Sequence, residues 1–168
     1  MKRRNNPASV SNSCLPGMIE ERLPTVAGSY LLWFFLARRQ PIAVGRLGVL
    51  EFKRGWYGYC GSACGPGGLK ARLRHHLQVT IAKPHWHIDY FKQQASLRLI
   101  WLEQNATREH QWSLQLEQLS GFSRPYPGFG ASDCDCVSHL LYCPARARLQ
   151  AAATELSAGG RLTRLRMP

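Results

Sequence analysis

Two tyrosines, each close to a glycine, are candidate catalytic residues. Tyr30 ends the triplet Gly-Ser-Tyr that begins at Gly28, and Tyr59 begins the triplet Tyr-Cys-Gly that ends at Gly61. A tyrosine hydroxyl can orient or deprotonate a water molecule, although its ordinary pKa of about 10 requires help from a nearby cation. Tyrosines on strands more often pack in the core, so the pair becomes informative only through the residues that follow it.

A basic helix is predicted over residues 69–77, where leucine recurs at every fourth position and forms an apolar stripe. Arg72 and His76 are also four residues apart, so they share a face at the edge of this stripe. Lys70 and Arg74 lie farther round the helix, toward solvent. A guanidinium at the border of the core needs an anion, and either a phosphate or a carboxylate would meet that need.

Three longer strings follow the same order along the chain. They read GSACGPGGL over residues 61–69, HWHIDY over residues 85–90 and GFGASDCDCVSHL over residues 128–140. Together with the two tyrosine triplets and the helix arginine and histidine, they resemble the GIY-YIG nuclease superfamily. The strings are most similar to a subfamily that has been described as a domain of unknown function. The resemblance spans about residues 25–145, which is most of the chain.

The resemblance implies both a fold and an activity. The expected fold is α/β of the α+β type, a small mixed sheet flanked by helices. The expected activity is metal-dependent endonucleolytic hydrolysis of phosphodiester bonds in DNA, in repair or processing. The superfamily's catalytic tyrosines, arginine and histidine correspond to Tyr30, Tyr59, Arg72 and His76. The resemblance also implies one carboxylate, from a later helix, that holds a single Mg²⁺ or Mn²⁺ ion.

Glu109 is our candidate for this carboxylate and metal ligand. A helix is predicted over residues 108–119, with Trp112 and Leu116 on its inward face, and Glu109 lies on the flank of that face. A carboxylate beside a buried face needs a cation as a partner. An acidic residue in the first turn is also favoured by the helix dipole alone. Glu103, at the end of the preceding strand, is the second choice.

Further residues close to these motifs are assigned to substrate binding: Gly61, Ser62, Lys70, Arg74, His85, His87 and Asp89. The string over residues 85–90 also invites a metal-site interpretation. In a strand its two histidines and its aspartate would share a face, whereas in a helix only His85 and Asp89 would. We favour substrate contact or a hydrogen-bonded structural role over a metal site.

A second group of potential metal ligands lies near the end of the chain. Cys134, Cys136, His139 and Cys143 form a Cys-x-Cys-x₂-His-x₃-Cys series. Structural zinc sites typically use Cys-x₂₋₄-Cys spacing with a distant second pair, so we favour reduced, partly buried cysteines over zinc. A redox-sensitive pair is a further alternative. The glycines of residues 65–68, which open a helix, either present N–H groups to a phosphate or form a plain turn.

The net charge of +12 indicates a polyanionic partner, for which we expect nucleic acid, and DNA rather than RNA. The longest apolar run, residues 30–37, is far shorter than the roughly 20 residues that span a bilayer. No apolar stretch follows the basic N-terminus, so we expect no signal peptide and no membrane partner. We therefore expect a cytoplasmic or nucleoid-associated protein with reduced cysteines.

The elements that must position these residues alternate between strands and helices. We expect strands over residues 28–37, 41–44, 47–52, 56–60, 95–103 and 137–142, and helices over residues 69–77, 108–119 and 144–157. They form one domain over residues 25–157, between a polar tail at 1–24 and a basic tail at 158–168. The leading hypothesis is a metal-dependent endonuclease. The alternatives are a non-catalytic nucleic-acid-binding module of the same fold and a zinc-stabilised interaction domain.

Overall fold

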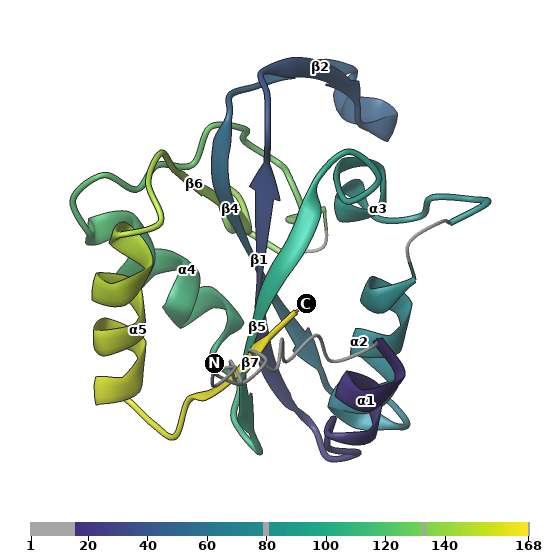
Figure 1. Cartoon of the computed structure of the whole chain (residues 1–168), viewed down its shortest axis with the longest axis vertical. Helices are drawn as coiled ribbons and strands as arrows, with labels where there is room; N and C mark the ends of the chain where they lie inside the picture. Colours follow the sequence, from purple (N-terminus) through teal and green to yellow (C-terminus); the bar gives the residue numbers. More distant parts are fainter. Residues whose placement is uncertain (1–15, 79–80, 133, 168) are drawn as a thin grey trace, which may run out of the picture.

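The structure is a computed structural model that describes residues 16–78, 81–132 and 134–167 (Figure 1). Its core is a five-stranded sheet in the order β6-β4-β1-β5-β7. The strands are β1 (Gly28–Leu36), β4 (Gly55–Ala63), β5 (Ser96–Gln104), β6 (Leu140–Cys143) and β7 (Thr163–Arg166). The predicted α+β class is confirmed. Each of these strand pairings is antiparallel, however, so the sheet is not the mixed sheet that we expected.

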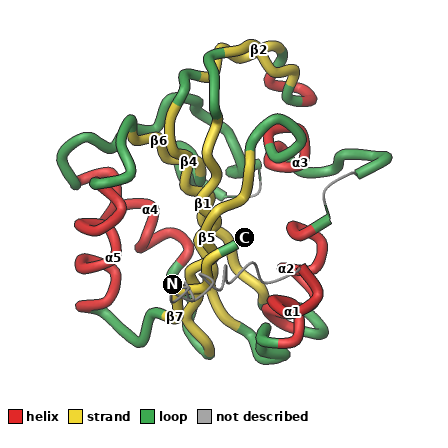
Figure 2. Tube along the Cα trace, viewed as in Figure 1, coloured by secondary structure: helices red, strands yellow, loops and turns green. Residues whose placement is uncertain are grey.

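Helices cover both faces of the sheet, which explains why the central strand β1 is almost continuously apolar. Tyr30, Leu32 and Phe34 belong to one core, which is covered by α1 (Pro16–Glu21), α2 (Gly68–Leu77) and α3 (His87–Phe91). Leu31 and Trp33 point to the opposite core. That core lies beneath α4 (Glu109–Gln118) and α5 (Arg148–Ala158), as Figure 2 shows.

A small hairpin extends beyond one end of the main sheet (Figure 1). It consists of β2 (Gln40–Ala43), the short 3₁₀ helix η1 (Gly45–Leu47) and β3 (Val49–Phe52). Ile42, Val44 and Phe52 are buried in the core beneath α3. The sequence predicted two short strands here, over residues 41–44 and 47–52, and the structure pairs them with each other. It carries Gly45 and Arg46 to the mouth of the cleft described below.

Each of the two segments predicted to be tails contributes one regular element to the domain. Within residues 1–24, α1 packs onto the domain, with Ile19 and Leu23 buried. Within residues 158–168, β7 pairs with β5 and buries Leu165. In each segment one or two buried apolar side chains, surrounded in sequence by polar residues, hold the element against the core. Residues 1–15 lie outside the described residues, and no helix among the described ones is long and apolar enough to cross a membrane.

The edge of β4 that faces away from β1 is covered differently along its two halves. Strand β6 pairs with β4 only from Trp56 to Tyr59. Beyond that point the N–H of Cys60 donates to the carbonyl of His139, just before β6 begins. The N-terminus of α4 packs against the same strand. The second half of β4 is therefore open to side chains from α4 and from the segment before β6.

Candidate active site

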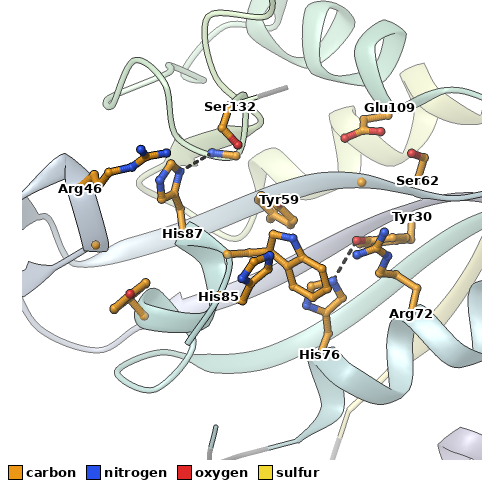
Figure 3. A pocket seen from close by; sticks show the side chains of 15 residues that line it. Tyr30, Arg46, Tyr59, Ser62, Arg72, His76, His85, His87, Glu109 and Ser132 are labelled. Carbon is orange, nitrogen blue, oxygen red and sulfur yellow. Dashed lines mark hydrogen bonds between the residues drawn. The ribbon is translucent and has the colours of Figure 1, made fainter. Parts of the chain in front are cut away.

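A cleft of about 490 Å³ lies beside β1, β4 and α2 (Figure 3). Most of the predicted site residues line this cleft, although they come from five separate parts of the chain. They are Tyr30, Tyr59, Gly61, Ser62, Arg72, His76, His85, His87 and Glu109. Lys70, Arg74 and Asp89 do not line it.

The first tyrosine and the helix histidine are joined by a hydrogen bond. The hydroxyl of Tyr30 lies 2.9 Å from Nε2 of His76, and both side chains are buried. Burial, with a smaller contribution from Tyr59, raises the pKa of Tyr30 well above its ordinary value. Burial also lowers the pKa of His76, to about 3, and the charges of Lys92 and His75 act in the same direction. Both groups are therefore neutral near pH 7.

The neutral state of His76 predicts a pH dependence of stability. The unfolded chain binds a proton at this residue below about pH 6.5, whereas the folded chain does so only near pH 3. His76 therefore contributes its full stability above about pH 6.5, and the contribution falls as the pH decreases, by at most about 1.4 kcal/mol per pH unit. Urea unfolding of the wild type and of His76→Gln across this range measures the difference in slope. His85→Gln, at an exposed position, should keep the wild-type slope; an unchanged slope in His76→Gln would contradict the burial argument.

Arg72 points back over the cleft from α2 toward Tyr30 (Figure 3). No carboxylate pairs with it in the described part of the chain. Its guanidinium instead lies over the ring of Trp86, 4.6 Å from the ring centroid. Stacking on an aromatic face orients a guanidinium while leaving its N–H donors free in the ring plane. The structural salt bridge that the sequence left open is therefore not what holds Arg72, and its donors are available to an anion in the cleft.

Glu109 enters the cleft from the opposite side, at the first residue of α4, and lies beside Ser62 (Figure 3). Its Oε1 atom is 2.8 Å from Nδ1 of His139, which is almost fully buried. No group in the described part of the chain forms a hydrogen bond with Nδ1 of His139, so Glu109 is the polar side chain that approaches it. Burial alone would raise the pKa of Glu109, but its contacts with His139 and Ser62 lower it. The carboxylate is therefore ionised near pH 7.

The HWHIDY string has two roles, divided between its residues. Asp89 is fully buried, and its Oδ2 atom accepts hydrogen bonds of 3.0 Å from the N–H groups of His85 and Trp86. Its Oδ1 atom lies 2.9 Å from Nε2 of His75. Asp89 does not line the cleft and instead has the hydrogen-bonded structural role that was the other favoured interpretation, because its carboxylate holds the loop. The loop in turn presents His85 and His87 to the cleft and Trp86 to Arg72.

Two basic residues lie outside the cleft, and the glycine segment before α2 adopts one of its two expected forms. Arg74 forms an ion pair with Glu20 of α1, with 2.6 Å between Nε and Oε1, and Lys70 likewise lies outside the cleft. The first N–H groups of α2, those of Leu69 and Lys70, donate to the carbonyls of Val26 and Pro24. The glycines before α2 therefore form a plain turn between β4 and α2. The amides of Leu69 and Lys70 are bonded to the segment that precedes β1, so they are not free for a phosphate.

Two glycines leave room for the tyrosine rings. Gly61 pairs with Tyr30 across β1 and β4, and a side chain at residue 61 would overlap the ring and hydroxyl of Tyr30. Gly130, with a φ of +73°, occupies the same position relative to Tyr59. The glycine in each case is needed because a ring lies where a β-carbon would be.

Gly61→Ala should therefore displace Tyr30 from His76. We expect the free energy of unfolding to fall by about 1–3 kcal/mol, the usual cost of overpacking a close contact, and the measurement is urea unfolding. Gly65→Ala is the matched control, because its β-carbon would meet nothing within 4 Å. Equal stability of the two variants would show that the position of the Tyr30 ring does not require a glycine at residue 61.

Several cleft residues were not predicted from the sequence. They are Gly45, Arg46, Trp86, Tyr90 and Gly130. Trp86, Tyr90 and Gly130 fall inside strings that the sequence analysis singled out, so membership of these strings indicated the cleft. Arg46 belongs to a separate hairpin, and nothing in its local sequence distinguishes it from other surface arginines.

The fold and the cleft define a small α+β domain with an open polar cleft. The family model for "Domain of unknown function DUF123" matches residues 29–160. The chain therefore belongs to the DUF123 family. No curated protein and no solved structure shows significant similarity to it.

Proposed function

We propose that this protein is a GIY-YIG-type, metal-dependent endonuclease that hydrolyses phosphodiester bonds in DNA. The observation that carries the proposal is the convergence, in one cleft, of an ionised carboxylate, an arginine without a carboxylate partner and a tyrosine held by a neutral histidine. These are Glu109, Arg72, Tyr30 and His76. Such a set suits phosphoryl transfer, in which catalysis is mainly positioning and charge stabilisation.

The donor set of the cleft fits one Mg²⁺ or Mn²⁺ ion. Glu109 is the only carboxylate among the described residues that line the cleft, and its side chain is 17% exposed. Mg²⁺ is commonly bound through one or two carboxylates while it keeps several waters. When bound, such an ion would offset negative charge on the phosphate and make a bound water more acidic. The second choice, Glu103, instead pairs with Arg108, with 3.3 Å between Oε2 and Nε.

The protein's own groups would then bind the phosphate and orient the water. Arg72 is placed to donate to the non-bridging oxygens of the scissile phosphate, where negative charge increases in the transition state. The hydroxyl of Tyr30 can donate a hydrogen bond to Nε2 of neutral His76. The hydroxyl oxygen of Tyr30 can then accept a hydrogen bond from the attacking water. The raised pKa of Tyr30 favours this orienting role over deprotonation of the water.

The rest of the cleft and the overall charge support a nucleic-acid substrate. Arg46 and His87 line the end of the cleft opposite Arg72 (Figure 3), and His85 lines it as well, so these residues could contact phosphates next to the scissile one. The net charge of +12 adds long-range attraction for a polyanion. A role in DNA repair or processing rests on the superfamily resemblance and is part of the proposal, as is a cytoplasmic or nucleoid-associated location.

The test is cleavage of labelled single-stranded, nicked and branched DNA by the pure protein, with Mn²⁺ or with EDTA. We expect Mn²⁺-dependent cleavage of at least one substrate. A non-catalytic binding module is the alternative, because the same basic cleft would bind phosphates without cutting. Binding that weakens steeply with salt, in the absence of any cleavage, would favour that alternative.

A further inference from the structure

A second cluster of titratable side chains lies beside Glu109 but outside the cleft. One potential ligand atom from each of His110, Cys134, Cys136 and His139 lies within 4.8 Å of all the others. The group differs from the series suggested by the sequence, because His110 of α4 takes the place of Cys143. Cys143 is fully buried in β6, where it pairs with Trp56.

We propose that these four residues form a structural zinc site. Two thiolates and two imidazoles are the ligands that zinc prefers, and two thiolates balance its charge. With zinc–ligand bonds of about 2.0–2.3 Å, tetrahedral ligand atoms lie roughly 3.3–3.8 Å apart. The cluster is slightly wider than this. His110 is exposed, so rotation of its side chain can close the gap without disturbing the core.

The surroundings of His139 match those of a zinc-bound histidine. Its Nε2 atom lies 3.3 Å from Sγ of Cys134, and its Nδ1 atom lies 2.8 Å from Oε1 of Glu109. Metal-bound histidines usually turn their second ring nitrogen toward a carboxylate, which fixes the ring and the tautomer. One carboxylate oxygen of Glu109 thus contacts the zinc ligand His139, and the other remains available to a metal ion in the cleft.

A zinc ion here would tie a long irregular segment to the body of the protein. The described residues between α4 and β6 form no regular helix or strand, and loops of this length are uncommon in compact domains. Part of the segment is already held, because Phe122 and Phe129 are buried and Ser123 pairs with Tyr142. Near its end, the Ser113 hydroxyl donates to the carbonyl of Ser138, and the N–H of Cys60 donates to that of His139. The zinc would add a link from this segment to α4 at the residue next to Glu109, and so would fix the position of the carboxylate.

The site is tested by measuring metal content, which does not depend on cleavage. Protein from zinc-supplemented cells, purified without chelator, should contain about one zinc ion per chain. Replacement of zinc with Co²⁺ should give the visible absorption of a tetrahedral ion together with a thiolate charge-transfer band. Cys136→Ser and His110→Ala should lose most of the zinc, whereas Cys64→Ser, at an exposed cysteine outside the cluster, should retain it.

Glu109→Gln probes the link between the two sites. It should weaken zinc affinity by about tenfold or more, because removal of an outer carboxylate partner has this effect at other sites. Wild-type protein without zinc, and without a Co²⁺ spectrum after Co²⁺ is added, would overturn the proposal. A disulfide between Cys134 and Cys136, found by thiol titration of the native protein, would overturn it as well. Neither result would bear on nuclease activity, which is measured separately.

Discussion

Replacing Glu109 with glutamine should reduce Mn²⁺-dependent cleavage by about a thousandfold or more while leaving the fold intact. Loss of the metal ligand removes several kcal/mol of charge stabilisation, and each 1.36 kcal/mol corresponds to about a factor of ten in rate. Glutamine keeps the size of the side chain but removes the negative charge. The measurement is the single-turnover rate on the preferred DNA substrate at saturating Mn²⁺.

Two controls separate this effect from others. Glu155→Gln, on α5 and outside the cleft, should cleave at the wild-type rate. Because Glu109 also contacts His139, the assay is run with saturating zinc, so that loss of zinc does not account for the result. Near-normal cleavage by Glu109→Gln under these conditions would exclude Glu109 as the ligand of the catalytic metal.

The second large effect is expected for Arg72→Ala. Removal of one preorganised donor to transition-state charge typically costs about a hundredfold to a thousandfold in rate. Affinity for DNA should change much less, because many other basic residues contribute to it. Arg72→Lys should restore only part of the rate, since an ammonium can neither stack flat on Trp86 nor donate in a bidentate fashion. The measurement compares the cleavage rate with DNA affinity for each variant.

Arg74→Ala is the matched control for Arg72. The residue lies on the same helix but pairs with Glu20 of α1, away from the cleft. We expect its cleavage rate to stay close to that of the wild type, with at most a small loss of stability, since partly exposed ion pairs are worth little. Equal losses in the two variants would mean that the helix contributes only general positive charge.

The part of the site on α2 could be predicted because it depends on local geometry. Arg72 and His76 are one helical turn apart, and the leucine stripe fixes which way they face. The glycine opposite Tyr30 was visible as part of a triplet, although only the strand register explains why it must be glycine. These features require no knowledge of how distant segments meet.

The other half of the site depends on contacts between distant segments, which no local pattern encodes. Glu109 and His139 come together because β6 leaves the second half of β4 unpaired. Spacing suggested Cys143 as a metal ligand, but strand β6 buries it, and His110 of α4 lies with the two other cysteines instead. For Asp89 the sequence left substrate contact and a hydrogen-bonded structural role open, and only the folded loop shows that its carboxylate accepts the N–H groups of His85 and Trp86.

Single-turnover cleavage tests most directly whether this cleft cuts DNA, as we propose. The protein is held in excess over the labelled substrate that it binds most tightly, so slow product release cannot hide the chemical step. We predict that the wild type cleaves the strand with Mn²⁺, and that neither the wild type in EDTA nor Glu109→Gln does so. Stable binding of every substrate by the wild type, without strand cleavage at any Mn²⁺ concentration, would contradict the account.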